Sequence, residues 1–393
     1  MKPSYPLATT TWDDEEVAAI QSVIASGMYT MGPRVAEFER AFADFTGSKY
    51  CVMSNSGSSA NLLMIAALRF RKQNSLAAGS EIIVPAVSWS TTYHPLQQYG
   101  LRLKFVDIDR DTLNYDLKAL AEAVGPDTRA IMVVNLLGNP NDFSAIKAIV
   151  ADRDIVLVED NCESLGAVFD GRQAGTFGVM GTYSGFFSHH ISTMEGGMTV
   201  TDDEELYHIM LSLRAHGWTR NLPKVNHVSG TKSDDAFTES FRFILPGYNL
   251  RPLEMSGAIG IPQLRKLPGM IAERRANAAR FAELMKCYPF ITVQRELGQS
   301  SWFGFSMLIG GGVSRQAVVA ALDTHRVDVR PIVAGNFAKN ECLKWFDYSI
   351  HAALPNAEEV DRAGLFVGNH HFPLITEFEA LRAALDSVKR TDA

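Results

Sequence analysis

The chain has 393 residues, a formal net charge of −7, 46% hydrophobic residues and 21% charged residues. This length suffices for a large and a smaller domain, the composition is typical of a folded globular protein, and the acidic net charge argues against non-specific nucleic-acid binding. No stretch is long and apolar enough to cross a membrane, and the first residues lack the apolar core of a signal peptide, so we expect a cytoplasmic protein.

The first half of the chain alternates helical and strand patterns. One amphipathic helix is predicted from a cap at Asp13 or Asp14 to Gly27, and a second one runs through residues 35–45 and ends at Gly47. Short apolar runs then predict seven strands, at residues 50–53, 82–84, 103–106, 131–134, 155–158, 183–187 and 198–201. Helical periodicity separates several of them, as at 61–70 and 117–124. The alternation predicts an α/β fold with a mostly parallel, seven-stranded sheet covered on both faces.

The second half has a different character. Residues 224–239 are polar and predict a long loop. After Pro252, a basic helix runs through Arg274, Arg275 and Arg280. A strand at 302–309, a helix at 315–325 and a last helix after Glu377 follow. We therefore predict a large α/β domain at residues 1–250 and a smaller α+β domain at residues 251–393.

Residues 56–60, Ser-Gly-Ser-Ser-Ala, connect the first predicted strand to an apolar helix. Small residues let the backbone approach an anion, and the N-terminus of a helix offers free N–H groups. The stretch suits a phosphate monoester, although a Ser-rich helix cap is more often structural. It is not a P-loop, because no Gly-Lys-Ser/Thr follows.

Two candidate ligand-binding side chains follow other strands. Asp160 comes directly after the strand at 155–158 and Glu159. Its carboxylate could pair with a protonated pyridine nitrogen or cap the next helix. Trp89 lies beyond the strand at 82–84 and could stack on a flat ring, although a tryptophan is more often part of a core. Both positions are at carboxyl ends of strands, where open α/β sheets bind ligands.

A histidine pair follows the sixth predicted strand. Residues 184–190 read Ser-Gly-Phe-Phe-Ser-His-His and precede Glu195 and two glycines. Because neighbours in an extended chain point to opposite faces, at most one of His189 and His190 faces a ligand there, and joint metal binding is disfavoured. Taken alone, such a pair is usually ordinary surface or core.

The chain has four scattered cysteines, Cys51, Cys162, Cys287 and Cys342. No two of them have CxxC spacing, so the sequence supports neither a zinc site nor a redox motif. We predict reduced, mostly buried thiols, no metal site and no iron–sulfur cluster.

The order of these features is more specific than any one of them. Ser-Gly-small-small-Ala, an aromatic residue after a strand, Glu-Asp, and Ser-x-Phe-x-x-His-x-Ile-x-Thr-x-Glu-Gly-Gly resemble the DegT/StrS family of nucleotide-sugar aminotransferases over almost the whole chain. The resemblance implies the fold-type I, aspartate aminotransferase-like architecture of enzymes that use pyridoxal phosphate (PLP). In that family a lysine forms a Schiff base with PLP. Here its position holds His189, and no lysine occurs between Lys147 and Lys224.

The replacement of lysine by histidine implies a particular chemistry. An imidazole cannot hold a stable Schiff base, so the resemblance implies a non-covalently held cofactor that works as pyridoxamine phosphate (PMP), formed with L-glutamate. His189, with an ordinary pKa near about 6.5, would serve as the base. The pattern is similar to the lysine-less sugar 3-dehydratases. The stretches 84–92, 159–164, 214–220 and 364–370 resemble the branch of the colitose pathway, which uses GDP-4-keto-6-deoxy-D-mannose and needs no iron–sulfur cluster. A 4-aminotransferase and a PLP-binding pseudoenzyme are the alternatives.

The resemblance also implies residues that bind the cofactor. Gly57, Ser58 and Ser184 would hold its phosphate. Trp89 would stack on its ring, and Asp160 would meet the pyridine nitrogen.

Three further positions carry implied roles. Glu163 would lie near the ring. Asn249 would reach the phosphate bound by the neighbouring subunit, which implies a homodimer with shared active sites. His216 would assist proton transfer or orient the sugar.

Overall fold

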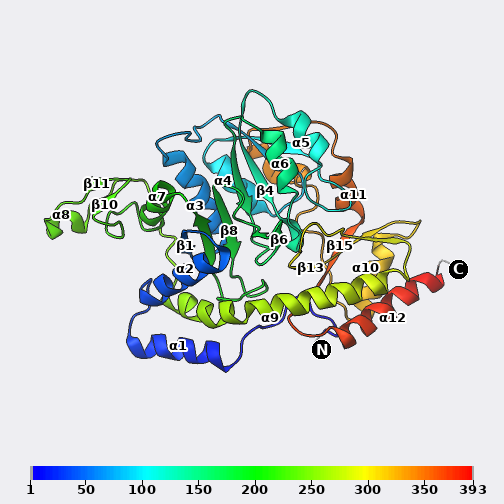
Figure 1. Ribbon diagram of the computed structural model, residues 1–393. Coiled ribbons are helices and arrows are strands. Elements are labelled where there is room, and N and C mark those ends of the chain that lie inside the picture. Colours follow the sequence, from blue (N-terminus) through cyan, green and yellow to red (C-terminus); the bar gives the residue numbers. More distant parts are fainter. Residues whose placement is uncertain (1–2, 392–393) are drawn as a thin grey trace.

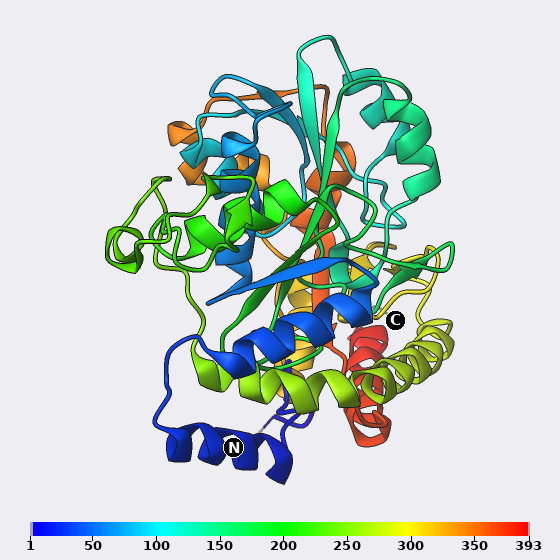
Figure 2. The same ribbon diagram turned by 60° about the vertical axis from the view of Figure 1, so that its left-hand side comes forward.

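The computed structural model describes residues 3–391 (Figure 1). A large sheet lies above the long helix α9 (Glu254–Met285), which runs toward the elements near the C-terminus. Helices α1 (Asp14–Ser26) and α2 (Pro33–Thr46) lie alongside α9 (Figure 2). Of the helices within residues 3–391, none combines the length and the apolar character that a bilayer span requires.

The large sheet contains all seven predicted strands, in the order β1-β9-β8-β5-β4-β2-β3-β14. Seven of its strands are β1 (Tyr50–Ser54), β2 (Glu81–Pro85), β3 (Arg102–Val106), β4 (Thr128–Val134), β5 (Val156–Asp160), β8 (Met180–Ser184) and β9 (Gly197–Thr201). The strands from β8 to β14 are parallel to their neighbours, while β9 is antiparallel to β1 and β8. The predicted α/β fold with a mostly parallel sheet is confirmed.

The eighth strand corrects the predicted strand number. β14 (Tyr348–Ile350) pairs with β3 at the edge of the sheet, although it comes from the C-terminal part of the chain. It has only three residues, and all three are exposed. So short a strand at an exposed edge has no apolar run that marks it in the sequence.

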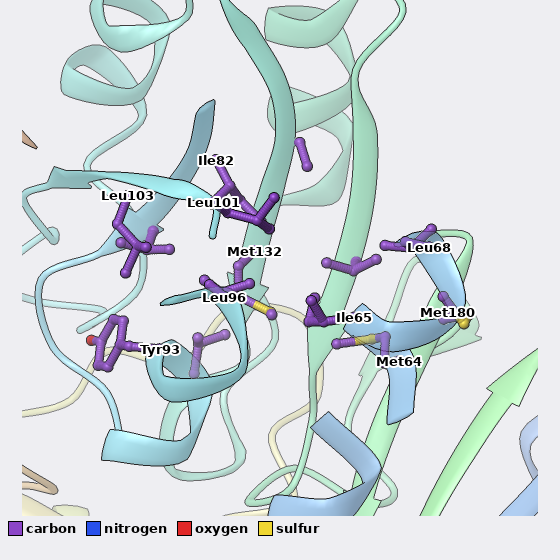
Figure 3. Packing of buried hydrophobic residues seen from close by; sticks show 14 of the residues in the cluster. Met64, Ile65, Leu68, Ile82, Tyr93, Leu96, Leu101, Leu103, Met132 and Met180 are labelled. Atoms are coloured by element: carbon purple, nitrogen blue, oxygen red, sulfur yellow. The ribbon is translucent and has the colours of Figure 1, made fainter. Parts of the chain in front are cut away.

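Helices cover both faces of the large sheet because the side chains of its strands alternate between two cores. Ile82 and Val84 of β2 belong to one buried cluster, and Ile83 belongs to the other. The first cluster packs under α3 (Gly57–Phe70), α4 (Ser90–Gln98) and α7 (Glu204–Arg214), and the second packs under α5 (Leu117–Ala123) and α6 (Phe143–Val150). Figure 3 shows Met64 and Leu96 in the first cluster.

The C-terminal part of the chain forms a second, smaller sheet with its own helices. The strands β12 (Ile291–Val293), β13 (Gly304–Ile309) and β15 (Gly364–Gly368) make a small antiparallel sheet. The helices of this region are α10 (Arg315–Thr324), α11 (Pro355–Ala363) and α12 (Ile375–Thr391). Tyr5 is buried in the same apolar cluster as β13 and β15, and its hydroxyl donates to the carbonyl of Gly368. The division of the chain at residue 250 stays a prediction.

Several short elements complete the described chain. They are β6 (Val168–Phe169), β7 (Arg172–Gln173), β10 (Val225–Asn226), β11 (Gly230–Thr231), α8 (Ala236–Ser240), and the 3-10 turns η1 (Leu136–Gly138), η2 (Phe337–Lys339) and η3 (Glu341–Trp345). The stretch 224–239, predicted as a loop, contains the β10–β11 hairpin and the start of α8, and it projects from the body of the molecule (Figure 1). These elements are too short for periodicity to reveal them.

The carboxylate of Glu254 joins α9 to the N-terminus of α2. Its oxygens accept hydrogen bonds from the backbone N–H groups of Gly32 and Arg34, both at 2.6 Å, and of Val35 at 3.3 Å. The residue before α2, Gly32, offers no side-chain cap of its own. Glu254 therefore acts as a cap that is supplied from another helix.

We expect Glu254→Ala to lower the free energy of unfolding by about 2–3 kcal/mol, because it leaves buried N–H groups of α2 without acceptors. Urea denaturation followed by circular dichroism measures this change. Glu283→Ala in the same helix is the control, since the Glu283 side chain is 74% exposed and its surface ion pair with Lys286 contributes little. Equal stability of the two variants would contradict the proposed cap.

Candidate active site

A cavity of about 500 Å³ opens at the carboxyl ends of the parallel strands. Its walls come from the N-terminus of α3, the start of α4, the ends of β5 and β8 and the loop after β8 on one side. Phe303, Arg330 and Phe366 of the C-terminal part form the other side. Seven of the predicted site residues line it: Gly57, Ser58, Trp89, Asp160, Glu163, Ser184 and His189. Residues that are far apart in the sequence, and that the sequence analysis selected separately, therefore line a single cavity.

The N-terminus of α3 forms one end of the cavity. Ser56 caps this helix, its Oγ accepting a hydrogen bond from the Ser59 N–H at 3.1 Å. Gly57 is required by close packing, since a Cβ there would lie 2.7 Å from Cβ of Ser184 and 3.1 Å from Sγ of Cys162. Free N–H groups at the start of this helix, beside the hydroxyls of Ser58 and Ser184, suit a phosphate group.

The Asp160 side chain is fixed in place at the end of β5. Its Oδ2 accepts hydrogen bonds from Nδ2 of Asn61 at 2.8 Å and from Oγ1 of Thr92 at 2.7 Å. Its Oδ1 accepts a bond from the N–H of Cys162 at 3.2 Å. The chain turns after Asp160 and no helix begins there, so the alternative role of a helix cap does not apply. The residue is a carboxylate in a defined orientation at the cavity wall.

Trp89 is exposed rather than part of a core. Its relative exposure is 57%, and it lines the cavity directly before α4. The more common alternative, a core tryptophan, is therefore wrong here. An exposed indole beside a fixed carboxylate and a helix N-terminus suits a flat, phosphorylated aromatic ligand.

Glu163 is a carboxyl group with a strongly altered environment. Burial raises its pKa to about 7, and the nearby carboxylate of Asp160 adds to the rise. A hydrogen bond from the Leu137 N–H to Oε2, at 3.2 Å, and the positive charge of Arg330 act in the opposite direction. Near neutral pH, Glu163 is thus able to hold or release a proton at the cavity wall.

His189 faces the cavity, and its neighbour His190 does not. The His189 ring lies between aromatic rings, with its centroid 5.0 Å from that of Phe303 and 5.8 Å from that of Phe186. Its Nδ1 is buried without a hydrogen-bond partner. Burial first, and then the charges of Arg330 and Arg274, lower its pKa to about 3. The imidazole is therefore neutral near pH 7, and its pKa lies well below the ordinary value expected from the sequence.

His190 points into the protein. Its Nε2 lies 3.0 Å from the carbonyl oxygen of Ser301, and the residue is only 1% exposed. The expectation that only one of the two histidines faces the ligand space agrees with this arrangement. Burial and then Arg274 lower the pKa of His190.

His216 and Asn249 lie outside the cavity of the single chain. His216 has a left-handed φ of 63°, and its ring packs against Trp218 at 5.4 Å. Asn249 is exposed, and its Oδ1 accepts a hydrogen bond from Nε of Arg251 at 2.9 Å. Their predicted roles, on the sugar and at the neighbouring subunit, stay predictions.

Among the cavity residues that sequence reasoning missed, three come from the C-terminal part of the chain. Phe303, Arg330 and Phe366 come from far along the chain and reach the cavity only through tertiary packing. The Arg330 guanidinium lies over the Phe366 ring, 5.1 Å from its centroid. No local motif marks these positions. Within the described residues, no group of three or more histidine, cysteine, aspartate or glutamate side chains is placed to hold a metal ion.

The chain matches a known family and close relatives along most of its length. Residues 10–377 match the model of the DegT/DnrJ/EryC1/StrS aminotransferase family. It is 61% identical over 385 residues to GDP-4-keto-6-deoxy-D-mannose 3-dehydratase of Escherichia coli O55:H7, covering 97% of this chain and 99% of the relative. The relative of that name from Yersinia pseudotuberculosis is 58% identical, with 96% and 97% covered.

Solved structures agree with these matches. The E. coli GDP-4-keto-6-deoxy-D-mannose-3-dehydratase with bound hydrated PLP has a TM-score of 0.97 at 61% identity, over 98% of this chain and all of that chain. A structure of GDP-4-keto-6-deoxymannose-3-dehydratase with a trapped PLP-glutamate geminal diamine has a TM-score of 0.96 at 61% identity, over 97% of this chain and all of the other.

The burial of His370 predicts that acid lowers the stability of the protein. His370 is 2% exposed, its Nε2 lies 2.9 Å from the Pro6 carbonyl oxygen, and burial lowers its pKa to about 4. The unfolded chain takes up this proton below about pH 6.5, while the native state does so only near pH 4. The stability contribution is thus complete above pH 6.5 and is lost as the pH falls toward 4.

We expect His370 to account for about 2 kcal/mol of the stability lost between about pH 7.5 and about pH 5. Urea denaturation at both pH values should show a correspondingly smaller loss in His370→Asn than in the unmodified protein. His325→Asn, at a partly exposed position, is the control. If His370→Asn and the unmodified protein lose the same amount, this assignment is wrong.

Proposed function

The chain belongs to the DegT/DnrJ/EryC1/StrS aminotransferase family, and we propose that within it the protein is a PLP-dependent GDP-4-keto-6-deoxy-D-mannose 3-dehydratase. It would remove the C3 hydroxyl to give GDP-4-keto-3,6-dideoxy-D-mannose, with L-glutamate as amino donor and 2-oxoglutarate and ammonia as co-products. One observation carries the proposal. His189 faces the cavity at the position of the family's lysine, and no lysine is among the cavity-lining residues of the described chain.

The cavity fits the cofactor at both ends. Gly57, Ser58 and Ser184 would hold the phosphate, because a close backbone approach, two hydroxyls and a helix N-terminus meet there. Asp160 would pair with the pyridine nitrogen, and Trp89 would cover the ring face. When bound as PMP, the cofactor supplies the amino group that condenses with the sugar ketone and a ring that takes up electrons as the C3–O bond breaks.

His189 would move the proton in this reaction. As a neutral imidazole it can accept a proton from C4′ of the cofactor, and the resulting imidazolium can protonate the departing C3 hydroxyl, which is a poor leaving group without a proton. A pKa of about 3 belongs to the protein alone. The negative charge of a bound phosphate raises the pKa of a nearby imidazole and so strengthens it as a base.

Glu163 would assist near the ring. Its carboxyl group has a pKa of about 7, so near neutral pH both its protonated and its ionised form are present to face polar groups of the cofactor.

The proposal includes a homodimer and a cytoplasmic location. Asn249 would reach the phosphate bound by the partner subunit, and this fits its exposed position outside the cavity of its own chain. His216 would approach the sugar from a neighbouring segment. The cytoplasm is the compartment in which nucleotide-activated sugars and L-glutamate are both available.

The decisive experiment is an incubation of the purified protein with PLP, L-glutamate and GDP-4-keto-6-deoxy-D-mannose, followed by mass spectrometry. We expect a sugar that has lost its C3 hydroxyl, together with 2-oxoglutarate and ammonia. His189→Asn should lose the sugar product by about a hundredfold or more, because the proton transfer then has no base. An amino sugar would indicate an aminotransferase instead, and an unchanged sugar with bound cofactor would contradict the proposed reaction.

Restoring the family's lysine tests why the histidine matters. We expect His189→Lys to bind PLP covalently, with an absorbance band of a protonated Schiff base that the unmodified protein lacks, and to turn over part of the sugar to an amino sugar. A lysine variant that binds PLP without this band and only dehydrates the sugar would contradict the role given to His189.

Cofactor retention without a covalent bond should depend on the packing at Gly57. We expect Gly57→Ala to weaken PLP binding by about tenfold or more, because its Cβ displaces Ser184 from the proposed phosphate site. Equilibrium dialysis measures the dissociation constant. Gly269→Ala is the matched control, since a Cβ at this position of α9 meets no atom within 4 Å. Unchanged binding in Gly57→Ala would place the phosphate elsewhere.

A further inference from the structure

Arg274 of α9 is a buried cation without a counter-ion. The residue is 3% exposed, and no carboxylate in the described part of the chain lies within ion-pair distance of its guanidinium. Its Nη1 donates hydrogen bonds to backbone carbonyl oxygens alone, those of Asn369 at 2.8 Å, Phe303 at 3.1 Å and Trp302 at 3.5 Å. Its Nε has no partner. Burying an unpaired charge is costly, so the retention of this arginine calls for a reason.

The carbonyl groups that Arg274 binds belong to the segment behind the catalytic base. Trp302 has a left-handed φ of 46°, which is strained for a residue with a side chain. The next residue, Phe303, donates its N–H to the carbonyl of Leu137 at 3.0 Å and presents its ring to His189. Arg274 therefore holds a strained turn in the one conformation that places the Phe303 ring against His189.

The same segment also fixes the neighbouring histidine. The Ser301 carbonyl oxygen lies 3.0 Å from Nε2 of His190, and the Phe303 ring centroid lies 5.7 Å from that of His190. Because His190 directly follows His189 in the chain, its anchoring limits the freedom of His189. Both histidines thus depend on the segment 301–303, and that segment depends on Arg274.

Other charged groups around His189 leave Arg274 a distinct electrostatic role. Arg330, which follows α10 in the chain, lowers the pKa of His189 more than Arg274 does, and it lies at the exposed rim of the cavity. The Asp160 carboxylate at the end of β5 also lines the cavity, where it accepts hydrogen bonds from Asn61 and Thr92. Glu163 and Glu195 line the cavity, and burial raises the pKa of both carboxyls. Among the cations that face His189, Arg274 is the fully buried one and is screened least by water.

We propose that Arg274 is a positioning residue of the active site, which clamps the Ser301–Phe303 segment behind His189 and places a buried, uncompensated positive charge behind that imidazole. The inference rests on the proposed function only for the use of the neutral imidazole as a base. The clamp and the charge are properties of the protein alone and are measurable without cofactor or substrate.

Two substitutions separate the clamp from the charge. Arg274→Lys keeps the positive charge but loses the forked donor, and Arg274→Gln keeps a donor but loses the charge. Arg274→Met is a second neutral variant in case the glutamine variant fails to fold. Arg275→Gln is the matched control, because Arg275 is the next residue of α9 and binds the carbonyls of Ser300 and Gly166 instead.

The readout is the NMR spectrum of the imidazole groups in histidine-labelled protein without cofactor. His189 is assigned by the signal lost in His189→Asn, and the pH is lowered from about pH 8 as far as circular dichroism shows an intact fold. We expect the protonated fraction of His189 at the lowest pH to be about fivefold or more higher in Arg274→Gln than in the unmodified protein. Arg274→Lys and Arg275→Gln should leave that fraction unchanged.

The clamp predicts a different pattern at about pH 8, where the ring is neutral in every variant. The carbon-bound ring protons of His189 should shift in Arg274→Lys, because the Phe303 ring moves, and should stay in place in Arg275→Gln. An unchanged protonated fraction in Arg274→Gln and Arg274→Met would overturn the role of the charge. Unchanged ring-proton positions in Arg274→Lys would overturn the clamp. A negative product assay would leave both results intact, so failure of the proposed reaction remains distinguishable.

Discussion

The carboxylate of Asp160 accepts hydrogen bonds from Asn61 and Thr92, and the amide oxygen of Asn61 accepts one from Oγ1 of Thr182 at 2.6 Å. This chain of bonds joins β5, β8, α3 and α4 at the edge where the parallel strands end. It exists because β5 and β8 run in the same direction, with Asp160 opposite Thr182. The cofactor contacts proposed within one chain depend on it, since the same elements carry the helix N-terminus, the indole of Trp89 and the loop with His189.

Much of the large sheet was predictable, because a strand buried on both faces leaves a continuous apolar run in the sequence. A strand forms at or beside each of the seven runs, but the sixth is displaced, because β8 ends at Ser184 and residues 185–187 belong to the following loop. β14 was not predictable, because a three-residue edge strand needs no apolar pattern. The side chains that line the cavity were predictable for a different reason, because the carboxyl ends of parallel strands meet at one edge of the sheet. Arg330 and Arg274 were not, because their roles arise from tertiary packing between distant segments. The low pKa of His189 likewise depends on burial and on these two cations, which the sequence does not place.

The loss of the family's lysine changes what the protein must provide for its cofactor. A covalent bond tolerates a loosely fitting cavity, whereas non-covalent retention requires that shape and charge be correct together. In the proposed function, the tight contact of Gly57 with Ser184, the fixed orientation of Asp160 and the exposed face of Trp89 would serve that need. In the loop after β8, an imidazole stands in the place of the family's flexible amine, so a base at this position must be positioned by its surroundings. The rings of Phe186 and Phe303 enclose it from two directions.

The hydroxyl of Tyr5 donates to the carbonyl of Gly368, and 363 positions separate the two residues. A second long-range contact is made by β14 (residues 348–350), which forms the edge of a sheet whose other strands come from residues 50–201. During synthesis on the ribosome, Tyr5 therefore lacks its hydrogen-bond partner until residue 368 has emerged. The large sheet likewise lacks β14 until residues 348–350 have emerged, and β3 forms its edge until then. Synthesis of residues 348–368, rather than completion of the seven strands at residues 50–201, therefore closes this fold.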